Sequence, residues 1–220
     1  MPAYASVVID VDSTLCGVEG IDVLAARRGP QVTAQIVALT DRAMKGEIPL
    51  ESIYGQRLTT IRPTRTDIAA LAAEYQRTVA PGAADAIDAM RAARARVALV
   101  SGGIREAIAP VAGKLGFDDA DVHAVSLRFD DAGNYVDFDR SSPLTTQPGK
   151  PVLVTALIED GRLPRPVLAV GDGATDAKLV GVVNRFVAYT GFARRANVVR
   201  VADGEVASFL ELAQIVIGQP

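Results

Sequence analysis

Short runs of β-branched and aliphatic residues recur along the chain, separated by stretches with helical periodicity. This alternation predicts an α/β fold with a doubly wound parallel sheet, because parallel strands are connected by crossover helices. Strands are predicted at residues 6–9, 97–100, 167–170, 186–189 and 198–201. Helices are predicted at residues 83–94 and 104–115, and Gly116 follows the second helix where a C-cap glycine is preferred.

Two further strand-like runs, residues 122–129 and 135–138, are joined by a short loop that contains Gly133. Apolar runs separated by a glycine-containing loop predict a β-hairpin. We expect this hairpin to flank a functional site as a flap.

Residues 18–78 have a different pattern from the rest of the chain. Helical periodicity covers residues 21–28, 32–44, 50–60 and 67–78, and glycine and proline residues separate these stretches. We interpret residues 18–78 as a helical-bundle cap inserted after the first strand, with residues 1–17 and 79–220 forming the core. Because open α/β sheets bind ligands at the carboxyl ends of their strands, an insert at this point would roof such a site.

Composition narrows the classes of function. Of the 220 residues, 49% are apolar, which is enough for one large domain or one domain with an insert. A formal net charge of -3 and a pI near 5.3 argue against nucleic acid or an anionic membrane as a partner. No apolar run is long enough to span a bilayer and the N-terminus has no basic stretch. We therefore expect a cytoplasmic protein, acting as a monomer or homodimer on a small molecule.

The sequence contains one cysteine, Cys16, and one histidine, His123. These counts exclude an internal disulfide and zinc sites that are built on several cysteines and histidines. Any metal must therefore be bound through oxygen atoms.

Three of the predicted strands run directly into polar residues that suit phosphoryl chemistry. Asp10 and Asp12 follow the first strand, residues 101–103 (Ser-Gly-Gly) follow the second, and residues 171–176 (Gly-Asp-Gly-Ala-Thr-Asp) follow the third. Each segment alone would more often be a turn, since these small and polar residues favour turns. Parallel strands would bring all three to one edge of the sheet, and their joint occurrence favours a site.

Four segments resemble, in order, the motifs of the haloacid dehalogenase superfamily: residues 10–14, 100–103, 149–150 and 171–176. Within this superfamily the chain resembles the phosphoserine phosphatases, because residues 19–22, 42–44 and 56–58 match the helical cap of those enzymes. The resemblance covers nearly the whole chain. It implies a Rossmann-like catalytic core beneath the cap.

The resemblance also implies a mechanism. Asp10 would attack phosphorus and form an aspartyl phosphate, and Asp12 would serve as general acid and then as general base. Mg²⁺ would be held by Asp10, the backbone carbonyl of Asp12 and Asp172, with Asp176 supporting the metal shell from outside. The ordinary alternative for Asp176 is an acidic residue near a helix start.

Substrate binding is implied for residues of both the core and the cap. The phosphate would be bound by Ser101, Gly102, Gly103, Lys150 and Thr175. In the cap, Glu19 would face the substrate ammonium group and Arg57 its carboxylate, and Met44 and Gly46 would line the pocket. Taken alone, Arg57 would usually be solvated on an amphipathic helix, and Met44 would usually be core.

The resemblance thus implies a Mg²⁺-dependent phosphoserine phosphatase that catalyses the final step of serine biosynthesis. The alternatives are a phosphatase for another small phosphomonoester, or a phosphotransferase. A phospho-accepting signalling module is a rival of another class, but Asp12 and the roofing insert favour turnover. Leu50 stands where relatives often have phenylalanine and Pro151 where they often have glycine; the change at Leu50 would alter the pocket wall and hence the size of the substrate.

Overall fold

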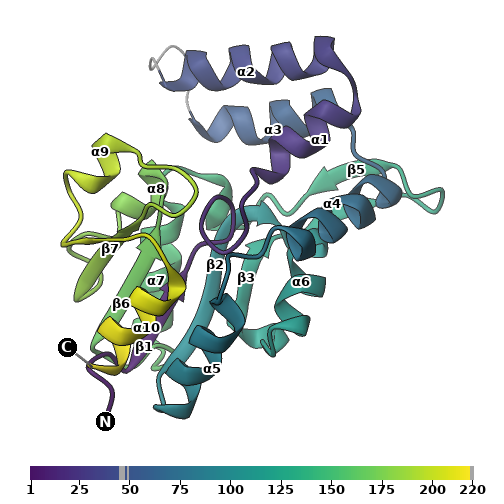
Figure 1. The fold of residues 1–220 in the computed structure, drawn as a ribbon. Helices are drawn as coiled ribbons and strands as arrows, with labels where there is room; N and C mark the ends of the chain where they lie inside the picture. Colours follow the sequence, from purple (N-terminus) through teal and green to yellow (C-terminus); the bar gives the residue numbers. More distant parts are fainter. Residues whose placement is uncertain (45–47, 49, 219–220) are drawn as a thin grey trace.

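The computed structural model describes residues 1–44, 48 and 50–218, without the side chains of residues 41, 43, 44 and 50. Six parallel strands form one sheet in the order β3-β2-β1-β6-β7-β8 (Figure 1). They are β1 (Ser6–Ile9), β2 (Arg96–Ile104), β3 (Val122–Val125), β6 (Val167–Gly171), β7 (Arg185–Tyr189) and β8 (Glu205–Val206). The chain moves outward from β1 in both directions, which confirms the predicted doubly wound α/β fold.

Helices flank this sheet. They are α5 (Ala83–Ala92), α6 (Arg105–Lys114), α7 (Gly149–Glu159), α8 (Ala174–Ala177), α9 (Ala196–Val199) and α10 (Phe209–Ile217). Figure 1 shows α5 and α10 side by side over one face, where they pack against each other. The central strands β1 and β6 are buried on both faces, since every residue in each of them is buried. A continuous apolar strand is expected where helices cover both sides of a parallel sheet.

In the described part of the chain, four helices lie between β1 and α5: α1 (Gly20–Arg27), α2 (Pro30–Met44), α3 (Leu50–Ile61) and α4 (Arg65–Arg77). In Figure 1, α1, α2 and α3 lie beyond the carboxyl edge of the sheet. Helix α4 packs against α1 and also against α6 of the core. Because α4 contacts both parts, the division of the chain at residues 18 and 78 stays a prediction. Among the described residues, no helix has the length and apolar character needed to cross a bilayer.

Residues 198–201 were predicted as a strand, and this prediction was wrong. Val198 lies in the short helix α9, and Val201 follows it in a turn with 44% of its surface exposed. The strand that pairs with β7 is Glu205–Val206 instead. A short β-branched run is compatible with either a strand or a helix. Here Val198 is buried in the core, whereas Val201 is exposed.

The predicted strand at residues 122–129 is divided between two sheets. Val122–Val125 is the parallel edge strand β3 beside β2. Only β4 (Leu127–Phe129) pairs in antiparallel fashion with β5 (Tyr135–Phe138). Ser126 separates the two strands. A strand-like run that no glycine or proline interrupts carries no signal for such a change of partner.

Candidate active site

The loop after β1 carries the first two acids. Asp10 follows the buried strand directly, and the chain then turns tightly, because the Cys16 N–H donates to the Val11 carbonyl at 2.9 Å. Ser13 has a φ of 52°, a left-handed conformation that a non-glycine residue adopts only when its surroundings hold it. This turn presents Asp10 and Asp12 at the carboxyl edge of the sheet.

The loop after β6 carries two more acids, and glycines make room for them. A Cβ at Gly171 would lie 2.2 Å from the Asp176 carboxyl carbon, so only glycine lets that side chain fold back toward the strand. The Gly173 N–H donates to Asp176 Oδ2 at 3.0 Å. Thr14, from the first loop, donates from its hydroxyl to Asp172 Oδ1 at 3.1 Å. The two loops are thereby joined.

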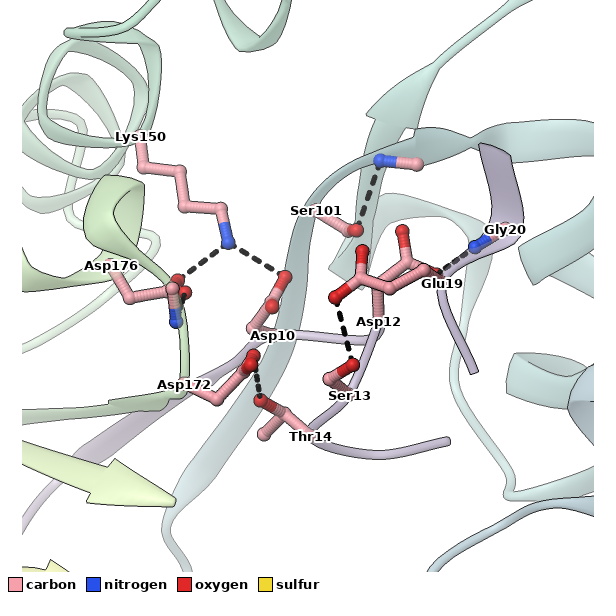
Figure 2. A network of polar contacts seen from close by, with 12 residues as sticks. Asp10, Asp12, Ser13, Thr14, Glu19, Gly20, Ser101, Lys150, Asp172 and Asp176 are labelled. Atoms are coloured by element: carbon pink, nitrogen blue, oxygen red, sulfur yellow. Dashed lines mark hydrogen bonds and ion pairs between the residues drawn. The ribbon is translucent and has the colours of Figure 1, made fainter. Parts of the chain in front are cut away.

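Lys150 enters the site from the first turn of α7. A Cβ at Gly149 would lie 1.9 Å from the Pro143 carbonyl oxygen, so glycine is required for this helix start to pack as it does. Lys150 is buried, and its Nζ lies 2.6 Å from Asp10 Oδ1 and 2.5 Å from Asp176 Oδ1. Figure 2 shows the ammonium group between these two carboxylates. The lysine therefore neutralises charge inside the site.

The strand β2 extends further than predicted. It continues through residues 101–103 to Ile104, with a register shift against β3 between Val100 and Ile104. Ser101 is buried, and its Oγ accepts a hydrogen bond from the Gly103 N–H at 3.0 Å. The irregular end of this strand presents backbone and hydroxyl groups to the space above Asp10 and Asp12.

Three buried carboxylates gather in this region. Ligand oxygens of Asp10, Asp172 and Asp176 lie within 4.8 Å of one another. Asp172 Oδ2 is buried and accepts no hydrogen bond from the part of the chain that the structure describes, although the Arg195 guanidinium contacts it as an ion pair. A cluster of carboxylate oxygens with such an oxygen fits a hard divalent cation. For Asp176, both oxygens already accept hydrogen bonds from Lys150 and Gly173, which fits an outer supporting role.

The protonation of these groups reflects their crowding. Burial, followed by the neighbouring Asp176 carboxylate, raises the pKa of Asp10 to about 8, while Lys150 acts in the opposite direction. Burial alone would lower the pKa of Lys150, but the carboxylates of Asp10 and Asp176 outweigh it and raise that pKa. Lys150 thus does not offset the combined effect of burial and the neighbouring carboxylate on Asp10. A bound cation would add to the effect of the lysine and favour the ionised form of Asp10.

Asp12 is held on the other side of Asp10, toward the insert. Its Oδ1 accepts hydrogen bonds from the Tyr75 hydroxyl at 2.6 Å and from the Gly20 N–H at 3.1 Å. Burial, followed by the charge of Glu19, raises the pKa of Asp12 to about 7, and the Tyr75 hydrogen bond acts in the opposite direction. A carboxyl with a pKa near neutrality can both donate and accept a proton.

A cavity of about 270 Å³ lies over these groups, and residues of α1, α3 and α4 line it together with the loops at the carboxyl edge of the sheet. Of the predicted site residues, it brings together Asp10, Asp12, Glu19, Arg57, Ser101, Gly102, Gly103, Lys150, Asp172, Thr175 and Asp176. Two of the predicted positions cannot be placed in this cavity: Gly46 lies outside the described residues, as does the side chain of Met44.

The insert contributes one cation and one anion to this cavity. Arg57, on α3, has a buried Nε with no hydrogen-bond partner among the described residues, and burial lowers the pKa of its guanidinium. Glu19 precedes α1, and its Oε1 accepts hydrogen bonds from Ser13 at 2.8 Å and from Arg195 at 3.1 Å. A buried polar group without a partner is costly, so Arg57 is a ready site for a ligand oxygen.

Sequence reasoning missed several residues that line the cavity, among them Tyr54, Tyr75 and Arg195. Both tyrosines lie on helical stripes, where an aromatic residue usually belongs to the core. Arg195 follows β7 in a run with Arg194, and such a pair usually lies on a solvated surface. The carboxyl end of β7 was a usable signal for Arg195, since the loops after β1, β2 and β6 already carried site residues.

Comparison with known proteins agrees with this geometry. Residues 7–180 match the family of haloacid dehalogenase-like hydrolases. The chain is 33% identical to a phosphoserine phosphatase of Mus musculus, over 94% of this chain and 91% of that protein. It is 34% identical to the chloroplastic phosphoserine phosphatase of Arabidopsis thaliana, over 94% of this chain and 70% of that protein.

A solved structure supports the fold. The phosphoserine phosphohydrolase-like protein from Francisella tularensis superposes with a TM-score of 0.82 at 23% identity, covering 96% of this chain and 99% of that one. The chain is therefore a phosphatase and belongs to the phosphoserine phosphatase family of the haloacid dehalogenase-like hydrolases.

Proposed function

We propose that the protein hydrolyses O-phosphoserine to serine and phosphate through an aspartyl phosphate on Asp10. One observation carries this proposal: a single cavity joins the buried pair of Asp10 and Lys150 to the unpartnered guanidinium nitrogen of Arg57. The first pair suits a phosphate and the second group suits a carboxylate. Phosphoserine carries both.

The first half of the reaction is a displacement at phosphorus. An Asp10 carboxylate oxygen forms a bond to phosphorus as the bond to the serine oxygen breaks, and Asp12 gives that oxygen its proton. Lys150 and the hydrogen-bond donors of residues 101–103 stabilise the charge on the phosphoryl oxygens. In the second half, Asp12 takes a proton from water, which attacks the aspartyl phosphate and releases phosphate. Asp12 ends each cycle protonated, as it began.

A divalent cation is expected at the three carboxylates. The oxygen-only cluster and the buried Asp172 Oδ2 fit Mg²⁺, with Asp10 and Asp172 as ligands together with the Asp12 backbone carbonyl. When bound, the cation would neutralise charge between the nucleophile and the phosphate. Asp176 would hold Lys150 and support the site from outside, as its two hydrogen-bonded oxygens indicate.

The amino-acid part of the substrate would be recognised by the insert. Arg57 can donate two parallel hydrogen bonds to a carboxylate, and Glu19 can face an ammonium group. Hydrolysis of phosphoserine yields free serine, so we place the enzyme at the last step of serine biosynthesis. The buried, unpaired thiol of Cys16 is compatible with the reducing cytoplasm.

The substrate assignment is tested by a panel of phosphomonoesters assayed with wild type and Arg57→Ala. Wild type is expected to prefer phosphoserine. Since the mutant loses the carboxylate contact alone, its kcat/KM should fall by about 10- to 100-fold for esters that carry a carboxylate and should change little for esters without one.

Gln56→Ala is the matched control, because Gln56 neighbours Arg57 on α3 but is exposed. It should leave all esters unaffected. An equal loss on every ester in Arg57→Ala would remove this residue from the carboxylate role, and a better ester without a carboxylate would overturn the assignment of phosphoserine.

A further inference from the structure

Tyr75 reaches the active site from α4 and contacts Asp12 directly. Its side chain is fully buried, and its hydroxyl donates to Asp12 Oδ1 at 2.6 Å. A tyrosine that only filled the core would leave a buried hydroxyl to be satisfied by any nearby acceptor. In this structure the acceptor is Asp12, the carboxylate that transfers the proton in the proposed reaction.

A second donor holds the same oxygen. The Gly20 N–H donates to Asp12 Oδ1 at 3.1 Å. A Cβ at position 20 would lie 2.2 Å from the Tyr75 hydroxyl, so the hydroxyl can approach only because residue 20 is glycine. A backbone N–H can only donate, which keeps Oδ1 an acceptor. Tyr75 and Gly20 therefore form a clamp on one oxygen of the carboxyl group.

The other oxygen of Asp12, Oδ2, faces residues 101–103, to which the proposed function assigns phosphate binding. A Cβ at Gly103 would lie 3.0 Å from Asp12 Oδ2 and 3.2 Å from Ser101 Oγ. Oδ2 is thus directed at the space where residues 101–103 would contact a phosphate. The two oxygens of Asp12 are not equivalent, because one is held by the clamp and the other lies beside the reacting groups.

We propose that Tyr75 is a positioning residue that, together with the Gly20 N–H, keeps the Asp12 proton on Oδ2. This inference rests on the proposed function and deepens it. As the phosphorus–oxygen bond breaks, its electron pair stays with the leaving oxygen, which takes the proton from Oδ2. When water attacks the aspartyl phosphate, its proton returns to Oδ2. Tyr75 keeps its own proton throughout and never touches substrate.

The test compares leaving groups. A serine alkoxide needs a proton as it leaves, whereas 4-nitrophenolate does not. In Tyr75→Phe, kcat/KM should therefore fall on the order of 10- to 100-fold for phosphoserine and by less than about 3-fold for 4-nitrophenyl phosphate. We choose kcat/KM because it reports phosphoryl transfer to the enzyme, the step in which the leaving group departs.

Tyr4→Phe is the control for loss of a phenol hydroxyl, since Tyr4 lies before β1 and away from the cavity. It should change neither substrate. Equal losses on both substrates in Tyr75→Phe, or no loss on either, would overturn the positioning role while leaving the proposed function intact. If wild type prefers another alkyl phosphate, that ester replaces phosphoserine, because the comparison needs only a poor and a good leaving group.

Gly20→Ala provides an independent test, because the added methyl group would displace the Tyr75 hydroxyl. It should show the same selective loss for the alkyl ester. In the double variant with Tyr75→Phe, the losses should not add, since both changes break one clamp. Additive losses would contradict a shared role. Melting temperatures of all variants show whether each remains folded.

Discussion

The ammonium group of Lys150 lies 2.6 Å from the Asp10 carboxylate in the interior of the protein, where both side chains are more than nine-tenths buried. The same ammonium group contacts Asp176 at 2.5 Å. A buried lysine is costly unless anions surround it, and here it pairs with two of the three clustered carboxylates. Stability and catalysis therefore depend on the same charge.

Replacement of Lys150 should lower both the stability and the activity of the protein. Lys150→Met leaves the carboxylates of Asp10 and Asp176 without their buried cation, so the free energy of unfolding should fall by about 3–5 kcal/mol. Turnover should fall by about 100- to 1000-fold, because a donor to the phosphoryl oxygens is lost. Urea denaturation and steady-state kinetics measure the two effects. Lys178 is exposed at the end of α8, so Lys178→Met should change stability by less than about 0.5 kcal/mol.

Magnesium should stabilise the folded protein through Asp172. A ligand that binds only the native state adds about 2.7 kcal/mol at one hundred times its Kd, so the melting temperature should rise with Mg²⁺ concentration. Chelation should remove both this shift and the activity, and added Mg²⁺ should restore them.

In Asp172→Asn the Mg²⁺-dependent shift should be lost or strongly reduced, because the buried carboxylate oxygen is gone. Asp160→Asn changes an exposed carboxylate and should keep the full shift. A full shift in Asp172→Asn would place the cation elsewhere.

The carboxylate of Asp67 should make the free energy of unfolding depend on pH in the acid range. Burial alone would raise its pKa, but hydrogen bonds from Thr64, Arg28 and Arg27 outweigh burial and hold the pKa well below its usual range. A lowered folded-state pKa contributes stability that is complete above the unfolded-state pKa of about 4 and is lost as the pH falls below it. Asp67→Asn should therefore cost about 1–3 kcal/mol at neutral pH and show a flatter loss of stability below pH 4.

Denaturant titrations between pH 2 and 7 measure this difference. Asp88→Asn is the matched control, since 77% of the Asp88 side chain is exposed on α5. It should follow the wild-type curve. Parallel acid curves for wild type and Asp67→Asn would show that this carboxylate contributes no pH dependence.

Two glycines in helices should respond to alanine in opposite ways. In Gly149→Ala the Cβ would overlap the Pro143 carbonyl, so α7 must shift, and both melting temperature and activity should fall as Lys150 moves. Gly113 lies in α6, and a Cβ added there would meet no atom within 4 Å, so Gly113→Ala should gain about 0.5–1 kcal/mol. Thermal melts of both variants test this contrast; a stabilising Gly149→Ala would show that the helix start is not tightly packed.

The parts of the fold that the sequence predicts are those set by local pattern. The first strand was predicted at its observed bounds, because a short apolar run ends at Asp10. The gathering of Asp10, Ser101 and Asp172 in one cavity was also expected, since it requires only that three parallel strands end at one edge. The roles of these residues in catalysis stay predictions until variants are tested.

The parts that were missed depend on contacts distant in sequence. Tyr75 donates to Asp12 across 63 positions of chain, and no periodicity in α4 distinguishes this tyrosine from a core residue. Arg195 contacts Glu19 across 176 positions. The wrong strand at residues 198–201 has the same cause, because pairing with β7 is decided by the later segment Glu205–Val206 and not by the valines themselves.

The most direct test of the account is to identify the residue that is phosphorylated during turnover. Wild type mixed with excess phosphoserine and Mg²⁺, quenched in acid within the first turnovers and digested for mass spectrometry, should carry one phosphoryl group on Asp10. Asp10→Asn should carry none and should not turn over. A phosphoryl group on another residue, or steady hydrolysis by Asp10→Asn, would contradict the account.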